Sequence, residues 1–277
     1  MMAAVRFEKW QALGNDYLIV EAAGLPFELT PERVRRLCDP HFGPGGDGIL
    51  ELGESTEPGY VARLRIFNPD GSEAELSGNG AREAIMYLHR RGWTDAREFS
   101  IQTVAGELRP RIESATHCTV DMGRARLRGE GELEAGGRRW AYQHIEIGNP
   151  QTAIRMAGRP ELEALDLAAI GPSIEHHANF PNRTNVSWWT ELAPDAIRAR
   201  IFERGVGETL SSGTGATGAA IAHVLRGGDS PVTVHLDGGE LTVDVGEDLH
   251  VDLAGWAVPV FAAELDPGFV RALEGEA

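Results

Sequence analysis

The segment Ser77-Gly-Asn-Gly-Ala-Arg-Glu-Ala84 recurs in the second half of the chain as Ser212-Gly-Thr-Gly-Ala-Thr-Gly-Ala219. Both copies read Ser-Gly-x-Gly-Ala-x-x-Ala, and each leads into an apolar, helix-forming stretch. A glycine-containing turn that opens a helix presents free backbone N–H groups and the positive end of the helix dipole. The repeat therefore predicts two related halves, each with a helix N-terminus suited to a small anionic ligand.

Length and charge limit the classes of protein that need to be considered. The chain has 277 residues and a formal net charge of −16, which suits two domains of about 130 residues. The acidic balance argues against binding to nucleic acid or anionic membranes, and no apolar run reaches the ~18–20 residues of a membrane span. The two cysteines, Cys38 and Cys118, lack metal-ligand or disulfide spacing, which indicates buried, reduced thiols in a cytoplasmic protein.

Strand signals outnumber helix signals along the chain. Apolar and polar residues alternate at 5–10 and 60–67, as in half-buried strands, whereas Thr30-Pro31 has the cap and first-turn proline of a helix start. The stretches 99–103 and 107–112 are predicted to pair as one hairpin. We therefore predict an α+β fold of two related domains, each with one long central helix beside a mostly antiparallel sheet.

The domain boundary is predicted where apolar periodicity is lost. Residues 122–136 are rich in glycine and charge, so we expect the chain to cross there between domains. The first domain is predicted to span residues 1–123 and the second residues 124–263. Residues 264–277 are predicted to return to the first domain.

The glycine motifs do not match the common phosphate or nucleophile loops. Gly78-Asn-Gly80 lacks the third glycine of a dinucleotide fingerprint, and no Gly-Lys-Ser/Thr sequence is present. Neither Ser77 nor Ser212 lies in Gly-x-Ser-x-Gly, which argues against a serine hydrolase. No metal site is predicted, because the histidines and cysteines lack ligand spacing.

A succession of short motifs extends over nearly the whole chain. In order, they are Leu13-Gly-Asn-Asp16, Gly45-Gly-Asp-Gly48, Phe67-Asn-Pro-Asp-Gly-Ser72, Ser77-Gly-Asn-Gly-Ala-Arg82, Gly148-Asn-Pro150, Thr184-Asn-Val186, Glu203-Arg-Gly-Val-Gly-Glu-Thr209 and Ser212-Gly-Thr-Gly-Ala216. This succession resembles that of the diaminopimelate epimerase family, from about Phe7 to Leu265. The Glu-Arg-Gly-Val-Gly-Glu-Thr and Asn-Pro-Asp-Gly-Ser segments are its most specific parts.

The resemblance implies both a fold and a chemistry. Members of the family have two pseudo-symmetric domains, each a sheet wrapped around a long helix, with the active site between them. They use no cofactor and convert LL- to meso-diaminopimelate in lysine and cell-wall biosynthesis, with two cysteines at the helix tips as acid and base. Thiolates at helix N-termini suit proton abstraction from carbon. The resemblance thus implies a small zwitterionic amino acid as ligand, and a homodimer is a further expectation.

The family's substrate-binding positions match here, but its proton-transfer positions differ. The resemblance assigns substrate contacts to Asn15, Asn68, Gly78, Asn79, Asn149, Asn185, Glu203, Arg204, Gly213 and Thr214. Both cysteine positions are serines, Ser77 and Ser212, and Gln151 stands where the family usually has a histidine beside the first cysteine. Glu203, the acidic partner of the second cysteine, is present. The predicted catalytic positions are therefore Ser77, Ser212 and Glu203.

The exchange of thiol for hydroxyl weakens the expected chemistry. A serine hydroxyl is far less acidic than a thiol, and its alkoxide needs a neighbouring base. Gln151 does not titrate, whereas Glu203 can act as a base on the Ser212 side. The loss of one acid/base group typically costs about 10²–10⁴ in rate. We therefore expect a diaminopimelate epimerase-like isomerase of low activity.

Three alternatives stay open at this point. The first is a related isomerase or epimerase that acts on another amino acid with a carboxylate base, for which Glu75, Glu83 and Glu203 are candidates. The second is a non-catalytic protein of this fold that binds an amino acid. The third is an engineered replacement of cysteine by serine, against which Gln151 and Glu83 argue, because trapping a substrate would require neither.

Overall fold

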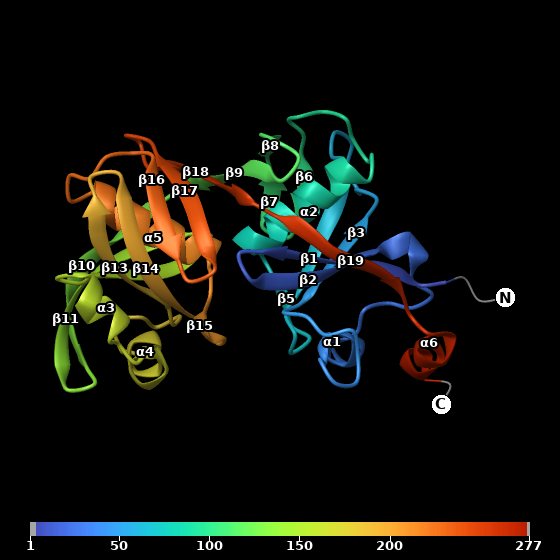
Figure 1. Cartoon of the computed structure of the whole chain (residues 1–277), viewed down its shortest axis with the longest axis horizontal. Coiled ribbons are helices and arrows are strands. Elements are labelled where there is room, and N and C mark those ends of the chain that lie inside the picture. The colour runs from blue at the N-terminus through green and yellow to red at the C-terminus, as the bar shows by residue number, and fades with distance from the viewer. Residues whose placement is uncertain (1–3, 276–277) are drawn as a thin grey trace. The chain divides into compact units, whose positions relative to one another are not determined.

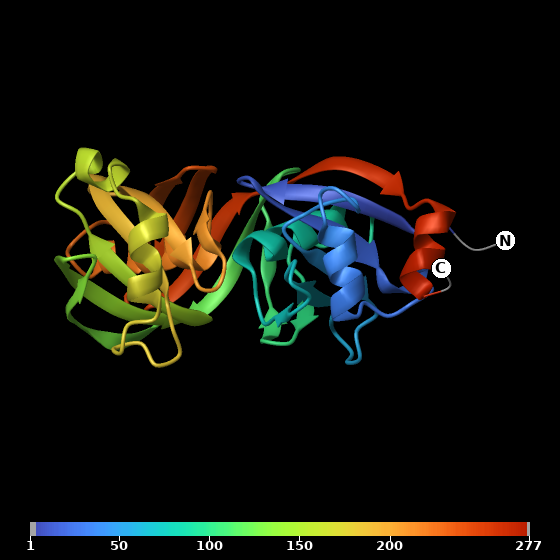
Figure 2. The same ribbon diagram turned by 90° about the horizontal axis from the view of Figure 1, so that it is seen from below.

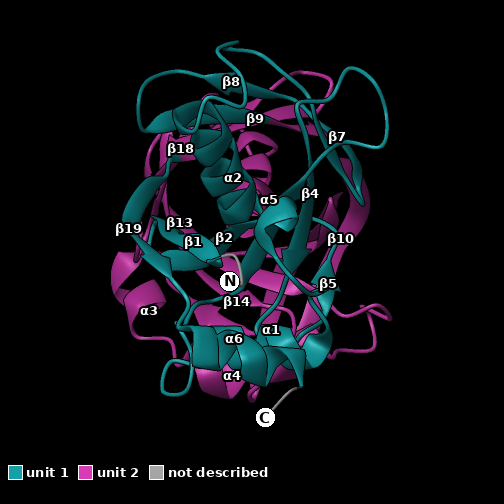
Figure 3. Ribbon diagram, turned by 90° about the vertical axis from the view of Figure 1, so that its right-hand side faces the viewer, with its two compact units in different colours: residues 1–120, 256–277 teal, residues 121–255 magenta. Residues whose placement is uncertain are grey.

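The computed structural model describes residues 4–275, so the predicted domain ends at 1–3 and 276–277 lie outside the described residues. The chain forms two compact units (Figure 3). Unit 1 comprises the residues up to Val120 and those from Trp256 onward, and unit 2 comprises Asp121–Gly255. The return to unit 1 begins before the predicted residue 264, because the intervening strand pairs with the first strand of unit 1.

The sheet of unit 1 has eight strands among the described residues. Their order is β19-β1-β2-β3-β4-β6-β7, with β5 beside β4. Neighbouring strands are antiparallel except for two parallel pairs, β2/β3 and β4/β6. The strands are β1 (Arg6–Ala12), β2 (Asn15–Glu21), β3 (Ile49–Gly53), β4 (Ala62–Phe67), β5 (Glu73–Ala74), β6 (Ile101–Thr103), β7 (Gly106–Leu108) and β19 (Val258–Glu264).

The second sheet begins with the same pattern. Its order is β10-β11-β12-β13-β14-β16-β17, with β15 beside β14, and it continues through β18, β9 and β8. Its parallel pairs are β12/β13 and β14/β16. The strands are β8 (Pro110–Ile112), β9 (His117–Arg124), β10 (Arg126–Ala135), β11 (Arg138–Ile147), β12 (Asn149–Arg155), β13 (Asn185–Ala193), β14 (Ala196–Glu203), β15 (Gly207–Thr209), β16 (Val232–Leu236), β17 (Gly239–Val245) and β18 (His250–Trp256).

The two units therefore share one topology, and the prediction of a doubled α+β fold with mostly antiparallel sheets is confirmed. In unit 1 the helix α2 (Gly78–Arg90) follows β5, and in unit 2 the helix α5 (Gly213–Val224) follows β15 (Figure 1). The repeated serine motif opens both helices at equivalent points of the chain. Each helix thus starts directly after the small hairpin that ends in β5 or β15.

Both central helices are buried along most of their length, and their glycines allow this. Residues Gly78–Leu88 of α2 and Gly213–His223 of α5 are all buried. A Cβ atom at Gly80 would lie 3.0 Å from a side-chain carbon of Leu50, and one at Gly215 would lie 2.8 Å from Ile201. The second glycine of each Ser-Gly-x-Gly motif therefore lets the first helical turn approach the sheet closely.

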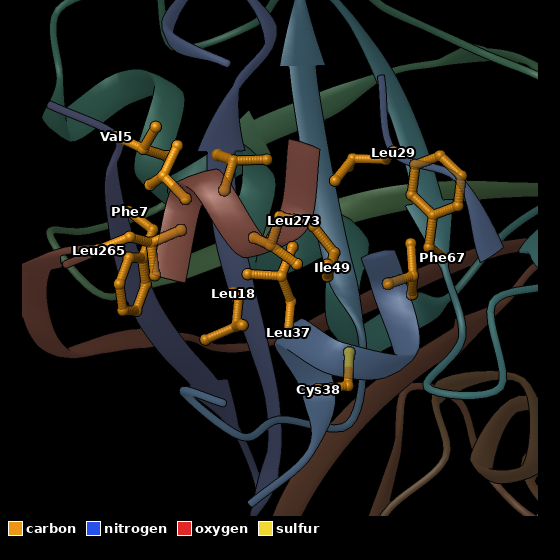
Figure 4. Packing of buried hydrophobic residues seen from close by; sticks show 13 residues of the cluster. Val5, Phe7, Leu18, Leu29, Leu37, Cys38, Ile49, Phe67, Leu265 and Leu273 are labelled. Carbon is orange, nitrogen blue, oxygen red and sulfur yellow. The ribbon is translucent and has the colours of Figure 1, made fainter. Parts of the chain in front are cut away.

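A pair of outer helices covers the far side of the unit 1 sheet. The helix α1 (Pro31–Cys38) begins where predicted, and the Thr30 side chain accepts a hydrogen bond at its N-terminus. The helix α6 (Pro267–Glu274) lies beside it, and Arg33 of α1 donates to the carbonyl of Leu273 in α6 (Figure 2). Their apolar faces pack on a cluster that includes Val5, Phe7, Leu18, Leu37, Ile49, Phe67, Leu265 and Leu273 (Figure 4).

The remaining helices are short. They are η1 (Ala22–Gly24) in unit 1, and α3 (Arg159–Glu163) and α4 (Leu167–Glu175) in unit 2. Among residues 4–275, no helix has the length and apolar character needed to cross a membrane.

The chain passes from unit 1 to unit 2 at Val120/Asp121, beside the crossover predicted in residues 122–136. That stretch lies largely in β9 and β10, and β10 pairs with β11 along its length. As an edge strand with most of its residues exposed, β10 needs no apolar alternation. The prediction that 107–112 forms one hairpin strand is wrong. The stretch divides at Arg109 into β7, which pairs with β6, and β8, which pairs with β9.

Candidate active site

Both serines of the repeat cap the N-terminus of a buried helix. The Oγ of Ser77 accepts a hydrogen bond from the backbone N–H of Gly80 at 3.1 Å, and the Oγ of Ser212 accepts one from Gly215 at 3.2 Å. Both serines have extended backbone, as N-cap residues do. Each cap occupies one of the free N–H groups of its first turn, and the positive end of the helix dipole lies at the same place.

In unit 2 a carboxylate is bonded directly to the capping serine. The hydroxyl of Ser212 donates a 2.9 Å hydrogen bond to Oε2 of Glu203. Oε1 of the same carboxylate accepts a 2.9 Å hydrogen bond from the hydroxyl of Thr209. Glu203 ends β14 and Thr209 ends β15, so the hairpin that precedes α5 holds the carboxylate in a fixed orientation. Ser212 itself is only 2 % exposed.

A chain of amides lies beside this pair in unit 2. The backbone N–H of Arg204 donates to Oδ1 of Asn185 at 2.7 Å, and Nδ2 of Asn185 donates to Oδ1 of Asn149 at 3.3 Å. Nε2 of Gln151 also donates to Oδ1 of Asn149. Because a backbone N–H can only donate, these contacts fix the orientation of each amide in turn. Oε1 of the fully buried Gln151 is left without a hydrogen-bond partner.

In unit 1 the capping serine contacts a tyrosine instead of a carboxylate. The hydroxyl of Tyr17, a residue of β2, donates to Oγ of Ser77 at 3.2 Å. Tyr17 is buried, and it presents a phenol hydroxyl to its serine where Glu203 presents a carboxylate. The two capping serines therefore have chemically different neighbours, although the folds around them match.

A second polar network in unit 1 holds two of the predicted substrate-binding residues. Nδ2 of Asn79 donates to Oδ1 of Asn15 at 3.1 Å, and Nδ2 of Asn15 donates to Oδ2 of Asp47 at 2.8 Å. The guanidinium of Arg82 donates to Oδ1 of Asn79 at 2.6 Å and to the carbonyl of Gly78 at 3.0 Å. These contacts fix the side chains of the first turn of α2.

Among the three carboxylates proposed as bases, only Glu203 contacts a capping serine. Glu75 is exposed to solvent. Glu83 is fully buried within α2, and neither of its carboxylate oxygens has a partner in hydrogen-bonding geometry. Burial raises the pKa of Glu83 well above its ordinary value, and the nearby charge of Arg82 lowers it by less. This direction favours the protonated form of Glu83, whereas a base must be ionised.

The other predicted residues lie at the ends of the same elements. Gly78, Gly213 and Thr214 form the first helical positions of α2 and α5. Asn68 bonds within its own turn, where Nδ2 donates to the hydroxyl of Ser72 at 3.0 Å. The exposed Arg204 side chain donates to the carbonyl of Asn182 at 3.1 Å. Substrate contact by these residues stays a prediction.

One group of side chains elsewhere in unit 2 has metal-ligating atoms close together. Asp121, His250 and Asp252 each place one such atom within 4.8 Å of the others. None of the three belongs to the predicted site. Nε2 of His250 lies 3.2 Å from Oδ1 of Asp121, and the group lies on β9 and β18.

The sequence reasoning missed two residues that contact the predicted site, Tyr17 and Thr209. Tyr17 follows Asn15 by two positions, as Gln151 follows Asn149, and both pairs start the second strand of a hairpin. This parallel spacing was visible in the sequence. Thr209 was within the quoted motif, but its contact with Glu203 depends on the pairing of β14 with β15.

The fold and the site together define a class of protein. It is a doubled α+β protein in which each unit presents a serine-capped helix N-terminus, and one serine is bonded to a carboxylate. Such a constellation is equipped for acid–base chemistry on a small anionic ligand.

Comparison with known proteins identifies the family. The chain belongs to the diaminopimelate epimerase family, whose model matches residues 7–128 and 144–256. It is 39 % identical to the diaminopimelate epimerase of Aromatoleum aromaticum over 277 residues, which cover 95 % of this chain and 99 % of that protein. It is 40 % identical to that of Magnetococcus marinus over 274 residues, which cover 94 % and 96 %. Membership places the chain among the epimerases, a class of isomerase.

Solved structures confirm the fold alone, since their sequences are distant. A phenazine biosynthesis protein of the PhzF family from Bacillus anthracis has a TM-score of 0.72 and 19 % identity, and the match covers 96 % of this chain and all of that one. A hydroxyproline epimerase from Agrobacterium vitis, with bound trans-4-hydroxy-L-proline, has a TM-score of 0.68 and 15 % identity, with 97 % and 95 % covered.

Proposed function

We propose that this protein moves a proton at the α-carbon of an amino acid without a cofactor. The first candidate reaction is the conversion of LL- to meso-diaminopimelate, in lysine and cell-wall biosynthesis. Family membership and relatives named for this reaction support the proposal. So do the ordered side chains of Asn15, Asn79, Asn149 and Asn185, which are positioned by hydrogen bonds in each unit. The ligand is then a small zwitterionic amino acid.

The hydrogen bond from Ser212 to Glu203 carries the proposal. The Oγ of Ser212 accepts the α-proton as its own hydroxyl proton passes to Oε2 of Glu203. The C–H bond of the substrate breaks, a new O–H bond forms on the serine, and the electron pair stays on the carbon as a carbanion. Thr209 keeps the carboxylate aligned during this transfer. The helix N-terminus stabilises the substrate carboxylate and the negative charge that develops on it.

The same arrangement explains why the reaction should be slow. A carboxylate is a weaker base than a thiolate, and the intervening hydroxyl must lose and regain a proton in one step. At Ser77, the first cysteine position, a hydroxyl also replaces the thiol, and the neighbouring side chain is the phenol of Tyr17, not a carboxylate. The proposal is therefore a diaminopimelate epimerase-type enzyme of low activity.

The test is exchange of the α-proton in deuterated water. Incubation with LL- and with meso-diaminopimelate, followed by proton NMR, is expected to show slow loss of the α-proton signal. Glu203→Gln should lower the rate by about 10²–10⁴, the usual loss for one acid/base group. Glu208→Gln is the matched control on the same hairpin, because Glu208 pairs with Arg200 and not with a capping serine, and it should leave exchange unchanged.

Other outcomes of this experiment contradict the proposal in different ways. Binding by calorimetry without any exchange would identify a non-catalytic amino-acid-binding protein. If diaminopimelate does not bind, the ligand is a different one, and proline and hydroxyproline would be tested next. If Glu203→Gln exchanges the α-proton as fast as the wild type, Glu203 is not the base, and another carboxylate must be assigned that role.

The proposal also includes a cytoplasmic location and a homodimer. The two free, buried cysteines favour a reducing compartment. Sedimentation velocity of the purified chain tests the dimer, and a single monomeric species across the micromolar range would contradict it.

A further inference from the structure

The two capping serines differ in the direction of their hydrogen bonds. Ser212 gives its proton to Glu203 and accepts only from Gly215. Ser77 accepts from two donors, the hydroxyl of Tyr17 and the backbone N–H of Gly80. With both bonds directed toward its oxygen, the hydroxyl proton of Ser77 is available to be given away. One serine is thus arranged as a proton acceptor and the other as a proton donor.

We propose that Tyr17 acts through Ser77 as a positioning residue and proton relay for the protonation half of the reaction. This inference rests on the proposed function. Ser77 gives its proton to the carbanion, so that its O–H bond breaks and a C–H bond forms. The proton of Tyr17 then moves to the Ser77 oxygen, and the phenolate regains a proton from water on product release. Delivery of a proton to the carbanion is the step that the hydrogen bonds of Ser77 suit.

The environment of Ser77 supports a donor role. Two hydrogen bonds to Oγ and the helix dipole all stabilise negative charge on that oxygen as its proton leaves. Tyr17 is 5 % exposed, so its hydroxyl is held at the serine and is not free to turn into solvent. In unit 2 the equivalent strand position is occupied by Gln151, whose amide bonds to Asn149. The tyrosine relay is therefore particular to unit 1.

Tyr87 provides a matched control within the same unit. It lies on α2, and its hydroxyl donates to Oε1 of Glu21 at 2.8 Å. Tyr87→Phe removes a buried hydroxyl and its hydrogen bond, as Tyr17→Phe does, without touching Ser77. A loss caused only by weaker packing would appear in both variants.

The first experiment separates exchange from inversion. Wild-type protein in deuterated water is followed by NMR for exchange and by chiral chromatography for the LL and meso forms. Tyr17→Phe should lower inversion at least ten-fold while Glu203-dependent exchange at the α-carbon persists, because removal still occurs and delivery does not. Tyr87→Phe should change neither rate. Equal inversion by Tyr17→Phe and wild type overturns the inference. Absence of exchange in the wild type counts against the proposed function instead.

The second experiment reports on Tyr17 without any turnover. In Ser77→Cys the thiolate would accept the same hydrogen bond from Tyr17, which lowers the pKa of the thiol. The pKa is read from the pH dependence of iodoacetamide alkylation. Burial raises the pKa of both native thiols, Cys38 and Cys118, to about 12, so they are not alkylated in the pH range of this titration. Adding Tyr17→Phe should raise the midpoint by about one pH unit. An unchanged midpoint overturns the inference, whatever the wild type does with diaminopimelate.

Discussion

At the scale of single residues, Glu83 is a carboxyl group in an unusual setting. It is fully buried in α2, and the backbone N–H of Tyr17 is near its carboxylate but outside hydrogen-bonding geometry. Burial raises the pKa of Glu83 well above its ordinary value. Since the folded state then binds the proton more tightly than the unfolded state, the stability linked to Glu83 is complete below the unfolded-state pKa of about 4.3. It is lost as the pH rises from there through the folded-state pKa.

We therefore predict that Glu83→Met stabilises the protein, and more so at high pH. A methionine fills a similar volume without a polar atom to desolvate, so the free energy of unfolding should rise by about 1–3 kcal/mol at pH 8. At pH 4 the gain should be smaller, because the Glu83 carboxyl of the wild type is then largely protonated in the folded and in the unfolded state. Urea unfolding at both pH values measures this. The exposed Glu75 provides the control, since Glu75→Met should show no such pH dependence. A loss of proton exchange in Glu83→Met would instead support Glu83 as the base.

The sequence predicted the site residues that belong to local patterns. Ser77 and Ser212 were found because the cap, the glycines and the helix are contiguous and occur twice. Glu203 was found through its motif, and its contact with Ser212 is now seen at 2.9 Å. The role of Tyr17 could not be predicted, because its partner is sixty positions away and the contact depends on how β2 packs against α2.

At the scale of elements, the packing of α5 against β12 depends on one glycine. A Cβ atom at Gly218 would lie 2.9 Å from Cβ and 3.2 Å from Cγ of Gln151. Gln151 is fully buried, so its side chain has no open space to move into. In the interior of a helix, Gly→Ala normally raises the free energy of unfolding by about 1 kcal/mol. At Gly218 the close contact should reverse that gain.

We predict that Gly218→Ala destabilises the protein by about 1–3 kcal/mol, the usual cost of overpacking a core. In a Gln151→Gly background both the Cβ and the Cγ of residue 151 are gone, so the contact is absent and the same substitution should stabilise the protein by about 1 kcal/mol. A double-mutant cycle from urea unfolding gives both values. Additive effects of the two substitutions would show that the helix and strand can separate without cost.

The elements that were predicted and those that were missed differ in their patterning. The start of α1 and the strands β1 and β4 agree with the sequence signals, because a cap or an alternating pattern marks them. The strand β3 was missed because all five of its residues are buried, which removes the alternation. The strand β10 was missed for the opposite reason, since nearly all of its residues face solvent. Pairing with neighbours, not local pattern, forms both strands.

At the scale of the whole molecule, each unit has its own central helix and its own apolar core. Both cysteines lie in unit 1, and burial keeps their thiols unreactive in the folded state. The helix α5 lies in unit 2. The reactivity of Cys38 and Cys118 therefore reports on unfolding of unit 1, and amide exchange along α5 reports on unit 2.

We predict that the two units unfold at different urea concentrations. Separate cores are expected to unfold as separate cooperative steps, so a single free energy would not describe the whole chain. Pulsed thiol labelling and deuterium uptake of α5 peptides, both read by mass spectrometry, give the two midpoints. Uptake along α2 must follow the thiol signal as an internal check. A common midpoint for α2, α5 and the thiols would contradict the prediction.

The matching strand order of the two sheets has an evolutionary consequence. An assembly of two identical half-length chains has the same side chains at both helix tips, because every substitution appears twice. When both halves lie in one chain, as the matching strand order shows here, each tip can change alone. The carboxylate beside one serine and the phenol beside the other are what that freedom makes possible.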